Sequence, residues 1–185
     1  MAGTLMTIGH STLAIEIFLR ALLDNGCEML VDVRRFPGSR RYPQFQQEAL
    51  FQSLGGVGID TAWREGLGGR RKPLADSGNT GWRNESFRGY ADYMTTAEFA
   101  GEMDWLMGAM ERKRVAVMCA EAVPWRCHRS LIADAVLARG GQVEDLFVTA
   151  DGRSSRKKHL LTSFARLNDG KVTYPGEQPG LFAGE

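Results

Sequence analysis

The segment from Val115 to Arg139 constrains the fold more than any other part of the chain. Val115 to Met118 form a continuous apolar run, typical of a strand buried on both faces, and polar residues begin at Cys119. Apolar residues then recur at helical spacing and end at a glycine pair: Leu131, Ile132, Ala135 and Val136, followed by Gly140-Gly141. The segment therefore predicts a strand, a loop and a helix. In open α/β sheets such a loop is where ligands bind, because unpaired helix amides point into the crevice.

The rest of the chain repeats this alternation. Further strands are predicted at Leu5–Ile8, Met29–Val33, Ile59–Trp63 and Gln142–Val148. One helix is predicted to begin after a cap at Ser11 or Thr12, and another to run from about Gln46 to Leu54. A third is predicted to begin at the capping box formed by Thr95 and Glu98, and a short one to cover Leu160–Leu167. We expect a single α/β domain with three α/β/α layers and a mainly parallel sheet. Residues 1–150 form the expected core, and residues 151–185 a C-terminal extension with a flexible tail.

Composition excludes several classes of protein. A chain of 185 residues with 43% hydrophobic and 24% charged residues is ordinary for a globular protein. No apolar run approaches the roughly 18 residues that a membrane span needs, so we expect no membrane association and a cytoplasmic location. Three cysteines are too few for a disulfide framework, which favours reduced thiols or metal ligands.

Several short blocks resemble one known family. The blocks are Thr7–Thr12, Val31–Arg40, Leu67–Arg70, Phe87–Ala91, Cys119–Glu121 and Cys127–Arg129. In this order they resemble the signature blocks of the bacterial domain of unknown function 488, over about Leu5 to Val148. The resemblance implies a compact α/β fold with a shared polar site, and it implies no activity.

Polar residues follow each predicted strand. Because the carboxyl ends of parallel strands share one edge, we expect the anion-binding candidates to line one crevice: His10, Ser11, Arg34, Arg35, Arg40, His128 and Arg129. Arginines and helix N-termini favour phosphate groups, and Asp32 and Glu121 could orient the arginines or act in acid–base chemistry. The plain alternative is a set of structural ion pairs of Asp32 or Glu121 with Arg34 or Arg129.

Cys119 and Cys127 are the candidate nucleophiles. Cys127 lies at a predicted helix N-terminus beside three basic residues, where a thiolate is stabilised. Cys119 with Arg126 has the outline of a phosphatase or sulfur-transfer loop, although six residues separate them where the phosphatase loop has five. Thiol catalysis or redox sensing is therefore one alternative function.

The same block could instead bind a metal. Cys119, Cys127 and His128 are donors that suit zinc or iron, with Glu121, His10 or His159 as a further ligand from elsewhere. Another alternative is structural, with His128 capping the helix or pairing with Glu121 in a buried polar network.

The C-terminal tail carries a separate signal. Gln178, Leu181 and Phe182 resemble the peptide by which bacterial replication and repair proteins bind the sliding clamp, although Pro179 stands where leucine is usual.

The sequence thus favours recognition of a phosphate-bearing ligand, a nucleotide or nucleic acid, in DNA maintenance. A thiol- or metal-dependent enzyme or redox sensor, and a clamp-binding adaptor, are the alternatives. It identifies neither a cofactor nor a reaction, and whether the chain is an enzyme is left open.

Overall fold

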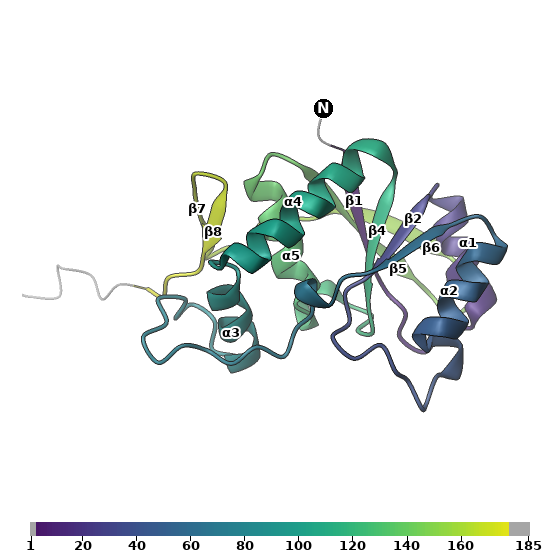
Figure 1. Cartoon of the computed structure of the whole chain (residues 1–185), viewed down its shortest axis with the longest axis horizontal. Coiled ribbons are helices and arrows are strands. Elements are labelled where there is room, and N and C mark those ends of the chain that lie inside the picture. The colour runs from purple at the N-terminus through teal and green to yellow at the C-terminus, as the bar shows by residue number, and fades with distance from the viewer. Residues whose placement is uncertain (1–2, 178–185) are drawn as a thin grey trace, which may run out of the picture.

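A six-stranded sheet forms the centre of the molecule (Figure 1), in a computed structural model that describes residues 3–177. The strand order is β3-β2-β4-β1-β5-β6. The strands are β1 (Thr4–Gly9), β2 (Met29–Asp32), β3 (Asp60–Trp63), β4 (Val115–Cys119), β5 (Gln142–Val148) and β6 (Ser154–Lys158). All neighbours are parallel except β6, which runs antiparallel to β5.

Helices cover both faces of this sheet. Figure 1 shows α1 (Ile15–Asp24) and α2 (Gln47–Gly56) on one side, and α3 (Glu85–Tyr93), α4 (Ala97–Arg112) and α5 (Arg129–Ala138) on the other. Each side has its own hydrophobic core, the first built around Phe18 and Leu50 and the second around Phe99 and Leu131. The predicted three-layer α/β fold with a mainly parallel sheet is confirmed.

The continuous apolar runs result from burial on both faces. Along β1, Leu5 packs into the core beneath α3 to α5, whereas Met6 and Ile8 pack into the core beneath α1 and α2. Thr7 is the polar exception: it is fully buried, and its hydroxyl donates to Asp145 at 2.6 Å. Buried polar atoms need such partners, so Thr7 marks a polar layer inside the second core.

The chain after residue 150 differs from the sequence expectation. β6 adds an edge strand to the sheet, and the helix predicted over Leu160–Leu167 is wrong: this segment leads into a hairpin of β7 (Arg166–Asn168) and β8 (Lys171–Thr173). Leu160 is 77% exposed, whereas Leu161, Phe164 and Ala165 pack against the second core without forming a helix. The Thr162 amide also donates to Asp134 at 3.2 Å, which fixes the segment to α5.

Helix starts also differ from the prediction. Ala14 begins α1 without a side-chain cap, so neither Ser11 nor Thr12 caps it, and Ser11 adopts a left-handed φ of 45°. α4 is capped by Thr96, which accepts from the Phe99 amide, rather than by Thr95.

α3 was not anticipated from the sequence. Gly89 lies within it, and glycine weakens a helical pattern. A side chain at this position would overlap the carbonyl of Arg71, so the close approach of that loop requires glycine.

Three short 3-10 turns complete the fold: η1 (Pro43–Phe45), η2 (Glu65–Leu67) and η3 (Pro124–Arg126). Within residues 3–177, no helix has the length and apolarity that crossing a membrane would require.

Candidate functional site

Three neighbouring strands end side by side at one edge of the sheet. Gly9 of β1 lies in register with Cys119 of β4, and Asp32 of β2 lies beside Met118. The pairing continues past the strands, because the His10 amide donates to the Cys119 carbonyl at 3.0 Å. The polar loops that follow the strands are therefore brought together.

Two hollows adjoin this edge. The thiol pocket, of about 380 Å³, is lined by Arg34, Arg35, Phe36, Gly69, Arg70, Ser86, Phe87, Cys119, Ala120, Glu121, Arg126, Cys127 and His128. The basic groove, of about 580 Å³, is lined by His10, Ser11, Thr12, Arg34, Phe36, Gly38, Ser39, Arg40, Arg41, Tyr42, Arg70, Ala120, Glu121 and Ala122. Arg34, Phe36, Arg70, Ala120 and Glu121 line both.

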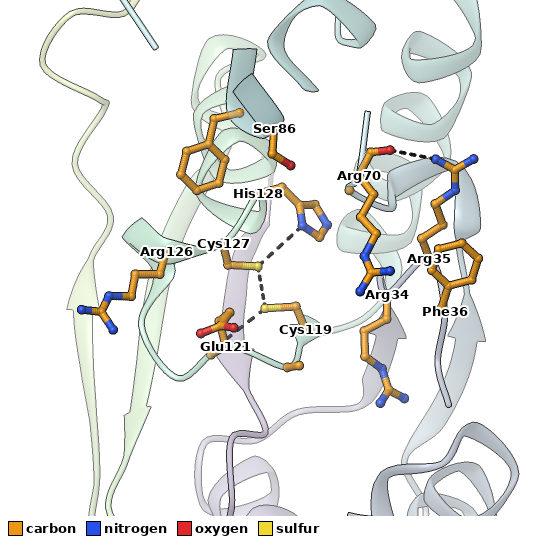
Figure 2. A pocket seen from close by; sticks show the side chains of 13 residues that line it. Arg34, Arg35, Phe36, Arg70, Ser86, Cys119, Glu121, Arg126, Cys127 and His128 are labelled. Carbon is orange, nitrogen blue, oxygen red and sulfur yellow. Dashed lines mark hydrogen bonds between the residues drawn. The ribbon is translucent and has the colours of Figure 1, made fainter. Parts of the chain in front are cut away.

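Two sulfur atoms meet at the wall of the thiol pocket (Figure 2). Cys127 donates its S–H to Cys119, with the Sγ atoms 2.6 Å apart. The hydrogen bond to Cys119, together with burial, raises the pKa of Cys127 well above its usual range. Cys127 is therefore the protonated partner and Cys119 the acceptor of the pair.

Arg129, at the start of α5, completes the surroundings of Cys119. Its side chain is 1% exposed, and Nη1 lies 2.7 Å from Cys119 Sγ. Burial acts to raise the pKa of Cys119, but the Cys127 hydrogen bond and the Arg129 charge outweigh it and lower the value to about 7. A substantial fraction of Cys119 is thus thiolate at neutral pH.

Arg129 is itself fixed by the loop between β4 and α5. Its guanidinium donates to the main-chain carbonyls of Glu121 and Ala122, and Nε lies 3.3 Å from Thr7 Oγ1. A side chain on Gly9 would overlap the Glu121 carbonyl, so this loop can approach β1 only because glycine ends the strand.

This loop geometry differs from that of a phosphatase loop, which surrounds its anion with main-chain amides. Here the carbonyls of Ala120, Glu121 and Ala122 point inward, toward the Ser11 amide and Arg129. Arg126 is exposed and extends away from the sulfur atoms in Figure 2. The arginine that meets Cys119 is therefore Arg129 and not Arg126.

Arg34 and Asp32 form a buried ion pair. Arg34 Nε and Nη2 donate to the two Asp32 carboxylate oxygens at 2.9 and 2.7 Å, and Nη1 donates to the Phe45 carbonyl at 2.7 Å. Asp32 is fully buried. This is one of the structural ion pairs that the sequence offered as the plain alternative, and it leaves Asp32 no contact with either hollow.

His10 is held beside this pair. Its ring stacks on Phe45 at 4.2 Å, Nδ1 lies 2.9 Å from the Ser11 carbonyl, and Nε2 lies 3.4 Å from Arg34 Nη1. The carbonyl requires a proton on Nδ1, so Nε2 is the acceptor. Burial lowers the pKa of His10 to about 4, which keeps the ring neutral.

His128 lies on the other side of the sulfur pair (Figure 2). Its Nδ1 is 3.6 Å from Cys127 Sγ, and its buried Nε2 has no hydrogen-bond partner among residues 3–177. Burial lowers the pKa of His128 to about 4. The ring does not cap α5, contrary to one alternative, and a side chain at Gly69 would crowd it at 2.9 Å.

Glu121 is the acidic residue that reaches both hollows. It is exposed and lines both of them, and only its main-chain carbonyl contacts Arg129. The predicted alternative of a Glu121–Arg129 ion pair is therefore wrong.

The more exposed arginines lie around the openings. Arg35 and Arg40 were candidates from the sequence, whereas Arg70 and Arg126 were not included among them. Arg35 Nη1 donates to the Arg70 carbonyl at 3.0 Å, and both guanidinium groups lie over the ring of Phe36, which is 61% exposed. Arg70 could have been identified from the sequence, because it follows Gly68-Gly69 in a loop that is rich in basic residues.

The remaining predictions concern a metal site and the C-terminal tail. Within residues 3–177, no group of three or more histidine, cysteine, aspartate or glutamate side chains has the arrangement needed to hold a metal ion. Gln178, Leu181 and Phe182 lie outside the described residues.

Comparisons with known proteins identify the family but no activity. The family model described as "Domain of unknown function DUF488" matches residues 14–136, more than half of the chain. The Thr7–Thr12 block, which carried part of the resemblance, lies before the matched region. No curated protein and no solved structure matches the chain. The chain therefore belongs to the DUF488 family.

Proposed function

We propose that this protein is a thiol-dependent redox enzyme or sensor in which Cys119 is the nucleophile and Cys127 the resolving thiol. The observation that carries the proposal is the contact of the two Sγ atoms at 2.6 Å, with Arg129 Nη1 2.7 Å from Cys119. A thiolate next to a resolving thiol is the arrangement that redox-sensing cysteines use.

The proposed reaction with a peroxide proceeds in two steps. The Cys119 thiolate attacks one peroxide oxygen, the O–O bond breaks, and hydroxide leaves and takes up a proton, which makes a sulfenic acid at Cys119. Cys127 then loses its proton and attacks the Cys119 sulfur, the S–O bond breaks, and water leaves. Two thiols are oxidised to a disulfide, and one peroxide is reduced to two waters. Arg129 stabilises the reacting thiolate.

The proposal is tested by mapping the oxidised cysteines. The reduced protein is treated with one equivalent of hydrogen peroxide, its remaining thiols are alkylated after unfolding, and peptides are identified by mass spectrometry. We expect a Cys119–Cys127 disulfide, with Cys27 alkylated. Alkylated Cys119 and Cys127, with no disulfide between them, would contradict the proposal.

The matched control is Cys127→Ser. Without the resolving thiol, Cys119 should stop at the sulfenic acid and be trapped by dimedone. A disulfide to Cys27 in the wild type, or equal dimedone labelling of both proteins, would argue against Cys127 as the resolving residue.

A second candidate function is favoured by the arginines around the hollows. Arg34 and Arg129 already bind protein acceptors, so we propose that Arg35, Arg40, Arg70 and Arg126 meet the phosphate groups of a ligand, a nucleotide or nucleic acid. Arg35, Arg70 and Arg126 line the thiol pocket, and Arg40 and Arg70 line the basic groove. The ligand would then be either the substrate of the thiol or a signal that controls access to it, in a role in DNA maintenance.

This candidate is tested by binding of short single-stranded DNA at several salt concentrations. Arg35→Ala combined with Arg70→Ala should weaken binding and flatten its salt dependence. Arg20→Ala on α1 is the control, because Arg20 is exposed and lines neither hollow. Equal binding by both variants would reject the arginines as phosphate ligands.

The clamp-binding tail stays a prediction. Removal of residues from Gln178 onward should abolish capture by the bacterial sliding clamp, whereas removal of the last two residues should not. Capture by the shortened chain would contradict this prediction.

A further inference from the structure

A third hollow lies outside the site described above. This aromatic pocket, of about 410 Å³, is formed by the η3 turn, the β5–β6 edge and the residues after them: Trp82, Pro124, Trp125, Ser130, Asp145, Phe147, Lys157, Lys158, His159, Leu160 and Thr162. It adjoins the thiol pocket at η3, where Arg126 lines that pocket and Trp125 lines this one, and at Trp82, whose ring packs on Phe87 of the thiol pocket.

Aromatic and aliphatic side chains are unusually exposed here. Trp125 is 64% exposed and Leu160 is 77% exposed, although both are large and apolar. The rings of Trp125 and Phe147 lie 6.3 Å apart and are inclined by 40°. Exposed apolar surface at a concave site marks a place where a ligand binds, and a broad indole face suits a planar ring.

The charges at this pocket favour an anion. Lys157 and Lys158 are exposed on the edge strand, and Lys157 Nζ lies 5.3 Å from the centre of the Phe147 ring. The only carboxylate of the lining, Asp145, accepts hydrogen bonds from Thr7 at 2.6 Å and from His159 at 2.8 Å. Asp145 is buried and already accepts these two hydrogen bonds, whereas the two lysines are exposed and give the pocket a positive rim.

Size and chemistry together select the ligand. A hollow of about 410 Å³ lies in the range of small-molecule sites and is too small for a folded partner. We propose that the aromatic pocket binds a nucleotide unit, with the base stacked on Trp125 and the phosphate at Lys157 and Lys158. A free mononucleotide and a single strand of nucleic acid both offer such a unit, because stacking and phosphate contact are common to both.

Binding is measured by isothermal titration calorimetry with the full chain. AMP and a ten-nucleotide single-stranded DNA are the two probes for the source of the nucleotide, and adenosine and inorganic phosphate are the probes for its parts. We expect AMP or the DNA to bind more tightly than either part. No binding of AMP and no binding of the DNA would overturn the proposal.

Two variants assign the binding to this pocket. Trp125→Ala should weaken it by at least about fivefold, because one stacked base is lost. Lys157→Ala with Lys158→Ala should weaken it and reduce its salt dependence. Leu74→Ala and Lys171→Ala, exposed residues outside this pocket, should bind as the wild type does.

The design separates this proposal from the two proposals for the thiol pocket. Trp125 is 64% exposed, so its truncation should leave the fold intact. The proposal is overturned if binding persists in Trp125→Ala but is lost in the double variant Arg35→Ala with Arg70→Ala. The nucleotide would then bind at the arginines of the thiol pocket. A Cys119→Ser protein should bind the nucleotide unchanged, whatever the outcome for the thiol chemistry.

Discussion

Two buried cysteines of this protein have opposite properties. Cys27, between α1 and β2, is 5% exposed, and Cys119 is 3% exposed. Burial raises the pKa of Cys27 to about 11, whereas the pKa of Cys119 is lowered to about 7. Equal burial therefore does not decide thiol reactivity, and the difference must come from the groups around each sulfur.

Both sulfurs have an arginine nearby, but the two arginines differ in their surroundings. Arg114, near Cys27, is 66% exposed and pairs with Glu28, so water and a carboxylate screen its charge. Arg129 is buried and contacts Cys119 directly. Cys119 also accepts the S–H of Cys127, whereas Cys27 donates its own S–H to the Met29 carbonyl. A thiolate is stabilised only where the cation is buried beside it.

The largest expected effect comes from Arg129→Met. The pKa of Cys119 should rise above its ordinary value, and alkylation at pH 7 should slow by about 100-fold, since each pKa unit changes the thiolate fraction about tenfold. The free energy of unfolding should fall by roughly 3–5 kcal/mol, because the carbonyls of Glu121 and Ala122 lose a charged donor. Iodoacetamide kinetics and urea unfolding measure the two effects.

Arg114→Met is the matched control for that change. It should leave both Cys27 and Cys119 at their wild-type alkylation rates, because its charge is already screened. An equal loss of Cys119 reactivity in both variants would show that net charge, and not contact, controls the thiolate.

An intermediate effect is expected from Cys127→Ala. Loss of the S–H donor should raise the pKa of Cys119 and slow its alkylation at pH 7 by about tenfold, in line with one pKa unit. Cys127→Ser keeps a donor and should stay within a few-fold of the wild type. The same loss in both variants would mean that the cysteine's packing, and not its hydrogen bond, matters to Cys119.

The smallest effect on stability is expected from the polar layer behind Arg129. Among the described residues, Cys27 has no such layer beside it. Arg129 contacts Thr7, Thr7 donates to Asp145, and His159 lies between Asp145 and Asp134. Burial alone would lower the pKa of His159, but the two carboxylates raise it from 6.5 to about 9. Its stabilising contribution is therefore complete below pH 6.5 and is lost as the pH rises through 9.

Unfolding measurements between pH 6.5 and pH 9 test this contribution. The wild type should lose on the order of 1–2 kcal/mol over that range, and His159→Gln should lose less. Parallel pH curves for the two proteins would contradict the role of the ion pairs.

The sequence predicted much of the fold because its strands are buried on both faces. Continuous apolar runs such as Val115–Met118 identified the strands, and a parallel sheet then required the residues after them to lie at one edge. The proximity of His10, Arg34 and Cys119 follows from that rule alone. β6 was missed because its five residues, Ser154–Lys158, are all exposed and carry no apolar pattern.

The roles of individual side chains depend on contacts that no pattern shows. By spacing the sequence offered Arg126 as the partner of Cys119, whereas the inward-facing carbonyls of the loop hold Arg129 there instead. Arg34 is basic in sequence but is occupied by Asp32 and Phe45. The polar layer joins Thr7, Asp145 and His159, which lie far apart along the chain, so only the folded structure relates them.

The most direct test of the account is the pH dependence of cysteine alkylation in the wild-type protein, resolved by peptide mass spectrometry. Cys27 serves as the internal reference for a buried thiol without a buried cation. We predict that alkylation of Cys119 rises with a midpoint near pH 7, while Cys27 stays unreactive until well above pH 9. If Cys119 and Cys27 instead titrate together above pH 9, Arg129 and Cys127 do not stabilise a thiolate, and the proposed chemistry is wrong.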